Sequence, residues 1–232
     1  MKKIITVFAV FCAVFLISCN SSERKNLSYK IKTVTADENY LSADIRYPKF
    51  KNLPELNRII EKDILDPYTE YKNTAGSDWD SINQIRKDTG STTETPPFEY
   101  KVYCDPIIDS ENYESLLINT YAYSGGAHGD ITLDSITYDK KQKKVVSITD
   151  LNKFTVEEIS QKCRETLAKN LNYTDGSAEA ESDKIKWIAQ GTEPLNESFQ
   201  VFTYNGKTLT VYFAPYIVAP HSCGVQKVEI SE

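Results

Sequence analysis

The chain has only two histidines, His128 and His221, and each lies close to a residue that could act as a nucleophile. Ser124 precedes His128, and Cys223 follows His221. A neighbouring base is what activates a serine or cysteine, so these are two formal catalytic pairs. No nucleophile elbow or other catalytic signature surrounds either pair. We therefore expect a protein that is not an enzyme.

A metal site is the second chemistry that these residues could support. His128, Asp130, His221 and Cys223 are all residue types that bind transition metals. Their spacing matches no recognised metal motif, and the sequence contains no Walker loop or dinucleotide fingerprint. We expect neither a bound metal nor a cofactor.

His128 lies in a glycine-rich loop between two β-rich runs, one ending at Tyr123 and the next starting at Ile131. Glycine supplies φ > 0 and permits close approach of other groups, so this cluster of glycines indicates a sharp loop of defined shape. We predict φ > 0 for at least one glycine and a hydrogen bond from the His128 ring to backbone. The candidate binding residues of this loop are Tyr121, Tyr123, Ser124, Gly125, Gly126, His128 and Gly129.

A second motif, Ala214–Pro220, has a proline near its start and another at its end, and we name it the proline bracket. Two fixed φ angles make such a segment stiff, so it offers a loop a fixed surface. We predict that the glycine loop packs against it and that His128 comes close to His221. Tyr216 and His221 therefore join the candidate binding residues.

The N-terminus has the pattern of a lipoprotein leader. Lys2 and Lys3 precede an apolar run, Ile4–Ile17, which is short for a membrane span and typical of a signal peptide. The run ends in Leu-Ile-Ser-Cys, which resembles the bacterial lipobox. We predict a signal peptide over residues 1–18, lipidation of Cys19, a polar tether over residues 19–27, and a location in the bacterial cell envelope, anchored to a membrane.

Alternating and helical patterns place the elements of the first half. Strands are expected over 28–35 and 40–47, the second ended by Pro48, and over 98–105 and 113–123. Apolar residues at helical spacing follow Pro54, and Pro67 is expected to kink or break this helix before a stripe containing Trp79 resumes. The Thr-, Ser-, Gly- and Pro-rich stretch 88–97 is expected to be an exposed loop.

The second half adds a hairpin over 131–148, a helix whose start has the capping box Thr155–Glu158, and a shorter helix around Trp187. A hairpin turns at Asn205-Gly206, and a last strand covers 225–230. Helices and strands mix without strict alternation. We therefore predict an α+β fold, a mostly antiparallel sheet with helices packed on it.

Three cysteines remain after the leader and Cys19 are set aside. Cys163 lies on the apolar face of a predicted helix and is expected to be a buried thiol. Cys104 and Cys223 each lie beside a strand end and a proline, and the bacterial envelope is often oxidising. We predict that these two form a disulfide.

Composition and charge are ordinary for a globular protein but exclude one class of partner. The formal net charge is −6, and it becomes −8 once Lys2 and Lys3 are removed with the leader. A nucleic-acid-binding protein needs a basic face, so we expect no nucleic acid partner. An acidic domain would instead complement a cationic protein.

Several stretches together resemble a known family: the Tyr-x-Tyr-Ser-Gly-Gly-Ala-His-Gly loop, Ile148–Leu151, and Gly206–Phe213 followed by the proline bracket. They are similar to the tandem domains shared by the extracellular part of the anti-sigma factor RsiV and the N-terminal region of the deacetylase PdaC. The resemblance implies an N-terminal module over 28–130 and a C-terminal module over 131–232, forming one compact unit. His221 and Cys223 depart from the family pattern.

The resemblance implies a binding protein of the cell envelope. The RsiV branch senses lysozyme, so the first hypothesis is recognition or inhibition of a lysozyme-like protein. The PdaC branch favours binding of peptidoglycan glycan, and an uncharacterised hydrolase is a third hypothesis. An exposed aromatic platform near the glycine loop would favour glycan, a broad acidic face lined by tyrosines would favour a protein, and an accessible histidine with an oriented partner would favour catalysis.

Overall fold

The computed structural model describes residues 28–93, 95–174 and 176–231. The predicted signal peptide, Cys19 and the tether lie outside these residues. The elements in chain order are β1 (Tyr29–Glu38), β2 (Leu41–Phe50), α1 (Pro54–Asp88), β3 (Phe98–Asp109), β4 (Tyr113–Tyr123), β5 (Asp130–Asp139), β6 (Lys144–Val145), the 3-10 turn η1 (Thr149–Leu151), α2 (Val156–Asn170), α3 (Ala178–Gly191), η2 (Asn196–Phe199), β7 (Phe202–Tyr204), β8 (Thr208–Phe213), η3 (His221–Cys223) and β9 (Gln226–Ser231).

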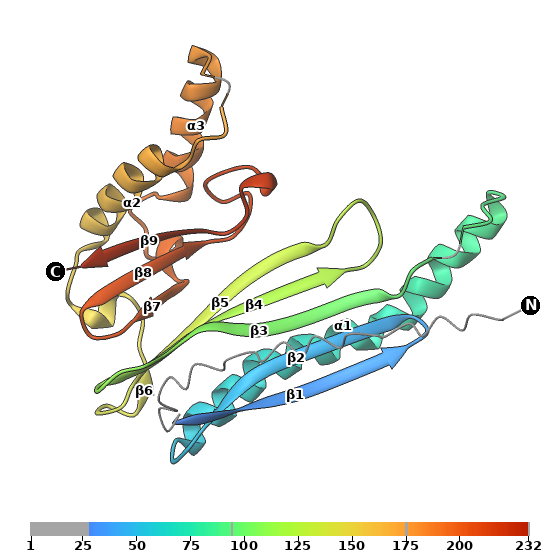
Figure 1. Ribbon diagram of the computed structural model, residues 1–232, viewed down its shortest axis with the longest axis horizontal. Helices are drawn as coiled ribbons and strands as arrows, with labels where there is room; N and C mark the ends of the chain where they lie inside the picture. Colours follow the sequence, from blue (N-terminus) through green and yellow to red (C-terminus); the bar gives the residue numbers. More distant parts are fainter. Residues whose placement is uncertain (1–27, 94, 175, 232) are drawn as a thin grey trace, which may run out of the picture.

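These strands form two sheets, a six-stranded one in the order β1-β2-β3-β4-β5-β6 and a three-stranded one in the order β7-β8-β9 (Figure 1). Neighbouring strands are antiparallel except for β2 and β3, which are parallel and joined by α1. The predicted α+β class with a mostly antiparallel sheet is therefore confirmed.

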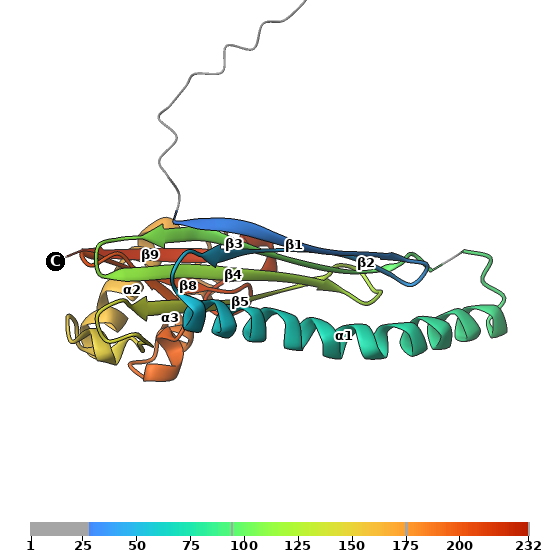
Figure 2. The ribbon, with the colours of Figure 1, turned by 90° about the horizontal axis from the view of Figure 1, so that it is seen from below.

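The first core lies between the large sheet and α1, which runs along one face of that sheet (Figure 2). Strand β2 alternates as expected, and its core-facing side chains are at most 4% exposed. Helix α1 buries an apolar stripe at a spacing of four residues against them. These buried residues are Leu41, Ala43, Ile45 and Tyr47 on β2, and Leu56, Ile60 and Ile64 on α1.

Helix α1 continues through Pro67 for 35 residues, so the predicted break is wrong. Proline in a helix removes one hydrogen bond and crowds the preceding turn. Ile64 and Tyr68 on either side of Pro67 are buried at 2% and 8% exposure. Packing of the helix on the sheet thus outweighs the local preference of one residue.

Pro48 also lies inside its strand, which continues to Phe50 rather than ending early. The parallel pairing with β3 covers only Leu41–Arg46 of β2. Beyond that point β2 has one neighbour, β1, where Pro48 lies opposite Ile31. A proline is tolerated in such a part of a sheet because its missing N–H leaves no ladder bond unmade.

The second module packs on the large sheet through serine hydroxyls. Ser115 of β4 and Thr137 of β5 are hydrogen-bonded at 2.7 Å, and by strand alternation they lie on the face opposite the α1 core. The backbone N–H of Tyr204 donates to Ser115 Oγ at 3.1 Å, and that of Phe202 donates to Ser135 Oγ at 2.9 Å. Strand β7 is thereby fastened to both β4 and β5.

The second core lies between the small sheet and α2. Thr155 caps this helix, with its side chain accepting from the N–H of Glu158 and its own N–H donating to Glu158, so the capping box is confirmed. The hairpin predicted at Asn205-Gly206 is present as β7 and β8, and its residues Leu209, Val211 and Phe213 are at most 2% exposed. Among the residues that the structure describes, the buried members of both cores lie between Leu41 and Ile230, so the chain from Ser28 onwards contains all of them.

The predicted module boundary at 130/131 lies just after the first residue of β5, Asp130, and it stays a prediction. Because β5 and β6 pair in the large sheet, the residues after this boundary contribute two strands to it. The two modules therefore share a sheet as well as an interface.

Candidate functional site

The glycine loop between β4 and β5 uses its glycines for two different reasons. Gly125 and Gly126 have φ of 91° and 105°, which confirms the predicted left-handed geometry. Gly129 makes room instead, because a Cβ there would lie 2.5 Å from the ring of Tyr121 and that ring would have to move. The shape of the loop therefore depends on backbone angles at one end and on the position of a tyrosine ring at the other.

Helix α1 holds the start of this loop. The Tyr71 hydroxyl donates to the carbonyl of Tyr123 at 2.8 Å and is 3.0 Å from Ser124 Oγ. The Tyr123 hydroxyl in turn donates to the carbonyl of Gly126 at 3.2 Å. Ser124 is thus engaged by a tyrosine of α1 and not by His128, its formal catalytic partner.

The predicted meeting of the two histidines is confirmed. The rings of His128 and His221 stack with centroids 4.3 Å apart and an interplanar angle of 22°. Nδ1 of His128 is 3.0 Å from the carbonyl oxygen of Gly129, which is the backbone contact expected for this ring. The ring of Tyr216 lies 5.4 Å from that of His221. The glycine loop and the proline bracket are therefore adjacent in space.

The proline bracket combines a buried anchor with an exposed tip. Val218 and Ala219 are 0% and 2% exposed, whereas Tyr216 and Ile217 are 54% and 46% exposed. Tyr216 has φ of 71°, a conformation that costs energy for a residue with a side chain. The N–H of Tyr216 donates to the carbonyl of Ala219 at 3.0 Å and closes the turn. The anchor thus holds a strained aromatic residue out towards solvent.

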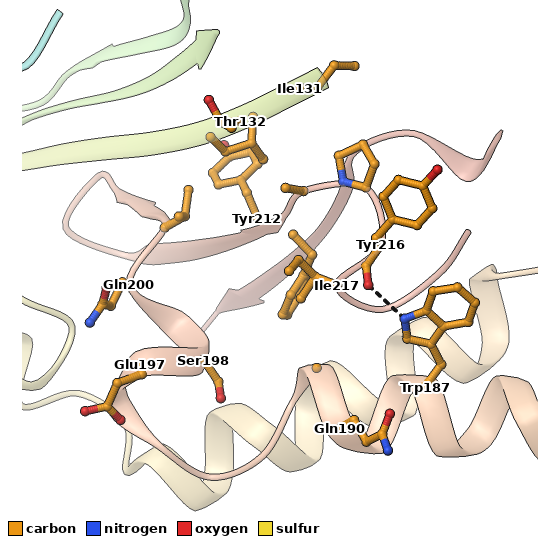
Figure 3. A pocket seen from close by; sticks show the side chains of 16 residues that line it. Ile131, Thr132, Trp187, Gln190, Glu197, Ser198, Gln200, Tyr212, Tyr216 and Ile217 are labelled. Atoms are coloured by element: carbon orange, nitrogen blue, oxygen red, sulfur yellow. Dashed lines mark hydrogen bonds between the residues drawn. The ribbon is translucent and has the colours of Figure 1, made fainter. Parts of the chain in front are cut away.

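Trp187 of α3 supports this tip from below, because its indole N–H donates to the carbonyl of Tyr216 at 2.9 Å (Figure 3). Gly191 lets α3 approach closely, since a Cβ there would lie 2.3 Å from the carbonyl oxygen of Ile217. Trp187 was predicted only to lie in a short helix. No local pattern indicates that its ring faces a groove.

These residues line one side of an open groove of about 770 Å³ between β5, α3, η2 and the bracket, which we name the Trp187 groove (Figure 3). Its walls are largely apolar and aromatic, and a few polar side chains lie along it, an arrangement typical of ligand sites. The aromatic residues are Trp187, Tyr212, Phe213 and Tyr216, and the polar side chains include Thr132, Gln190, Glu197, Ser198 and Gln200.

The predicted site residues thus divide into two sets. His128, His221 and Tyr216 come together beside the groove, whereas Tyr121 and Tyr123 shape the loop behind them. Lys101 Nζ lies 5.5 Å from the centroid of the Tyr121 ring, a cation–π contact between neighbouring strands. Among the residues that the structure describes, no group of three or more His, Cys, Asp or Glu could hold a metal ion.

The predicted disulfide is wrong, because Cys104, Cys163 and Cys223 are all free thiols. Cys104 packs against the first core and Cys223 against the second, so each thiol is held by a different module. Cys163 is fully buried, as expected. Burial raises the pKa of the Cys104 and Cys163 thiols to about 12, which leaves them in the unreactive protonated form.

Comparison with known proteins gives two family matches in tandem. Residues 34–130 match the family model described as deacetylase PdaC, and residues 148–232 match that of a protein of unknown function, DUF3298. Within residues 28–231 as described, no helix is long and apolar enough to cross a membrane.

One curated relative is the peptidoglycan-N-acetylmuramic acid deacetylase PdaC of Bacillus subtilis, which is 25% identical over 209 residues. The match covers 88% of this chain but 40% of that protein, so the chain spans about two fifths of the relative's length.

Two solved structures share the fold. A DUF3298-family protein of Bacteroides fragilis superposes with a TM-score of 0.63, and one of Pseudomonas aeruginosa with a TM-score of 0.55. Both are 16% identical to this chain, and each match covers 88% of this chain and 90% of the other. The tandem PdaC and DUF3298 regions show that the chain belongs to the RsiV/PdaC-like family that its glycine loop and proline bracket resemble.

Proposed function

We propose that this protein is a non-catalytic binding protein of the cell envelope and that it binds peptidoglycan glycan in the Trp187 groove. The observation that carries the proposal is the exposed aromatic tip of the bracket. Tyr216 is 54% exposed beside the glycine loop, and the hydrogen bond from Trp187 fixes its position. Sugar rings present flat C–H faces that stack on such side chains, and this is the platform expected for a glycan.

The remaining groove residues fit the same ligand. Gln190, Ser198 and Gln200 can donate and accept hydrogen bonds with sugar hydroxyl and acetamido groups. The relative from Bacillus subtilis is named for an activity on peptidoglycan, which supports a cell-wall ligand for this chain as well. We propose binding without chemistry because Ser124 is engaged by Tyr71 and the described histidines have no acidic partner.

We further propose that lipidation of Cys19 anchors the protein to a membrane, with residues 19–27 as a tether to the folded region. The narrow Leu-Ile-Ser-Cys ending of the apolar leader supports this proposal. An anchored glycan-binding protein would hold its membrane close to the cell wall.

Recognition of a lysozyme-like protein is the second candidate. The net charge of −6 favours it, because an acidic protein attracts a cationic enzyme. The exposed Tyr216 and Ile217 could also serve as an apolar contact for a protein. A contact of this kind should weaken steeply with added salt, whereas binding of a neutral glycan should not.

The test compares two tyrosines of matched exposure. Tyr216 and Tyr103 are 54% and 52% exposed, but Tyr103 lies on β3, away from the groove. We expect Tyr216→Ala to weaken binding to insoluble peptidoglycan and to chitotetraose about tenfold, equal to about 1.4 kcal/mol. Tyr103→Ala should bind like the wild type.

Binding is measured by co-sedimentation and calorimetry on the chain from Ser28 onwards, with hen lysozyme as a parallel ligand. Equal glycan binding by the two variants would refute the glycan proposal. Salt-sensitive binding of lysozyme alone, lost in Tyr216→Ala, would establish the second candidate instead.

A further inference from the structure

A second groove lies towards the far end of α1, lined by residues of the last turns of the helix, of the β1–β2 turn and of the segment before β3. Figure 1 shows α1 running past the β1–β2 turn at this end of the large sheet. Its volume is about 940 Å³. We name it the Trp79 groove. Its lining includes Asp37, Asn39, Trp79, Asp80, Asn83 and Thr95.

Trp79 is held in this groove in the same way as Trp187 is held in the other. Its indole N–H donates to the carbonyl of Pro96 at 3.2 Å, and part of its ring packs on the first core. Because the N–H is already bonded, the ring offers the groove an apolar face. The chain has only two tryptophans, so each groove contains one.

Two side chains that line this groove each contain a buried polar atom without a hydrogen-bond partner. Thr95 Oγ1 belongs to a side chain that is only 5% exposed, and it is unpaired. Nδ2 of Asn83 is buried and unpaired as well. A buried polar group without a hydrogen-bond partner costs free energy of folding, and such groups are rare in native proteins. No residue that lines the Trp187 groove contains such an unpaired buried atom among those described.

The types of these atoms indicate the ligand. An amide N–H such as Asn83 Nδ2 needs an acceptor oxygen, which excludes a simple cation as the ligand that satisfies it. Thr95 Oγ1 can donate or accept, and the carboxylates of Asp37 and Asp80 accept from hydroxyl groups. Together with the apolar face of Trp79, these groups fit a neutral ring that bears both hydroxyl and carbonyl oxygens.

We propose that the Trp79 groove is a second saccharide site, which takes an N-acetylated neutral sugar. The acetamido carbonyl or a hydroxyl oxygen accepts from Asn83, a sugar hydroxyl bonds to Thr95, and the sugar ring lies on Trp79. This site is separate from the Trp187 groove and does not depend on the function proposed there. A chain with both sites binds two short oligosaccharides.

The two tryptophans allow each groove to be observed separately. The chain from Ser28 onwards is labelled with 5-fluorotryptophan, and its two ¹⁹F signals are assigned with Trp79→Phe and Trp187→Phe. Chitotetraose, which is N-acetylated, is titrated against maltotetraose, which is not. We expect chitotetraose to shift the Trp79 signal in a saturable way and maltotetraose to shift it at least fivefold more weakly.

Thr95→Val is the decisive variant because valine keeps the shape of threonine and removes only the unpaired hydroxyl. Removing a hydroxyl that stabilises the fold would lower the melting temperature, whereas removing one that only binds a ligand would not. We therefore expect Thr95→Val to melt at the same temperature as the wild type or higher, yet to need at least fivefold more chitotetraose to shift the Trp79 signal. Asn83→Leu should weaken the same signal, and neither variant should alter the Trp187 signal.

Each outcome decides one of the two proposals. A Trp79 signal that stays still while Trp187 responds would overturn the second site and leave the first intact. A response of Trp79 alone would support the second site and refute the Trp187 groove. A Trp79 shift that is unchanged in both Thr95→Val and Asn83→Leu would also overturn the proposal, since the unpaired atoms would then only bind water.

Discussion

The two tryptophan grooves are built from similar parts but differ in whether the buried polar atoms of their lining residues have hydrogen-bond partners. In each, a tryptophan on a helix donates its indole N–H to a backbone carbonyl beside a proline segment. The Trp187 groove has apolar and aromatic walls, and it borders the second core at Phe213. None of the described residues that line it has a buried side-chain polar atom without a hydrogen-bond partner. The Trp79 groove is more polar, and two of the side chains that line it each contain a buried atom without a hydrogen-bond partner.

This difference indicates two modes of recognition. A groove with apolar walls and satisfied polar groups gains affinity by stacking and shape, so it tolerates variation in the hydroxyl pattern of a ligand. A groove with unpaired buried donors gains most from a ligand that supplies the missing partners, and it rejects analogues that lack them. We expect the Trp187 groove to be the less selective of the two.

A side chain added at Gly191, where α3 packs on the proline bracket, should have the largest effect on stability. A Cβ at Gly191 would lie 2.3 Å from the Ile217 carbonyl oxygen and 2.7 Å from Val218 Cγ1. A backbone oxygen cannot rotate away as a side chain can, so α3 or the bracket must move. We expect Gly191→Val to lower the free energy of unfolding by about 3 kcal/mol, measured by urea denaturation.

Gly76 of α1 provides the matched control near the other groove. A Cβ there would make an ordinary contact of 3.6 Å with the Tyr40 ring. Alanine is the better helix former, so Gly76→Ala should raise the free energy of unfolding by about 0.5–1 kcal/mol. If Gly191→Val cost no more than a typical surface change, the close packing of α3 on the bracket would not be what shapes that groove.

A change remote from both grooves should alter stability alone, and Glu114 of β4 offers one. Its side chain is 2% exposed, one carboxylate oxygen is 2.8 Å from Lys140 Nζ, and the other has no partner. Burial raises the pKa of Glu114 to about 7 from its ordinary value near 4.5. Between these values the folded state binds the proton more tightly, so this residue's contribution to stability is full below about pH 4.5 and is lost as the pH rises to about 7.

Glu114→Gln mimics the protonated side chain. We expect it to leave stability unchanged near pH 4 and to raise the free energy of unfolding by about 2 kcal/mol near pH 8, with glycan binding unaffected. The exposed ion pair of Glu229 with Lys227 serves as the control, because Glu229→Gln should change little at either pH. An equal effect of Glu114→Gln at both pH values would contradict the raised pKa.

Local sequence patterns predicted the elements whose structure depends mainly on interactions between residues close together in the chain. The capping box at Thr155, the alternation along β2 and the Asn205-Gly206 turn each depend on neighbouring residues. The errors at Pro48 and Pro67 have the opposite cause. Pro48 is tolerated because the pairing of β2 with β3 ends before it, and Pro67 because the buried face of α1 holds the helix on the sheet. Neither contact can be read from one stretch of sequence.

The site shows the same division. Glycine clustering predicted the shape of the loop, and the stiffness of the bracket predicted where the loop packs. The role of Trp187 was missed because its hydrogen bond to Tyr216 spans 29 positions of the chain. Thr95 lies in a stretch predicted to be exposed, yet it is buried, because the end of the loop folds back onto the helix that precedes it.

A smaller effect is expected at Tyr71, which lies on α1 and links that helix to the glycine loop beside the Trp187 groove. Tyr71→Phe keeps the ring that packs 4.9 Å from Tyr100 but removes the hydroxyl that donates to Tyr123. We expect a cost of about 1 kcal/mol, because the freed carbonyl lies near solvent at the start of the loop.

Hydrogen exchange can show where that cost falls. If the two grooves are independent, amides of residues 124–129 should exchange about fivefold faster in Tyr71→Phe, whereas those around Trp79 should not change. Faster exchange around both tryptophans would show that α1 couples the grooves as one cooperative unit, since Tyr71 and Trp79 lie on the same helix. In that case a ligand that orders one groove would also stabilise the other, and the two ¹⁹F signals would titrate together rather than separately.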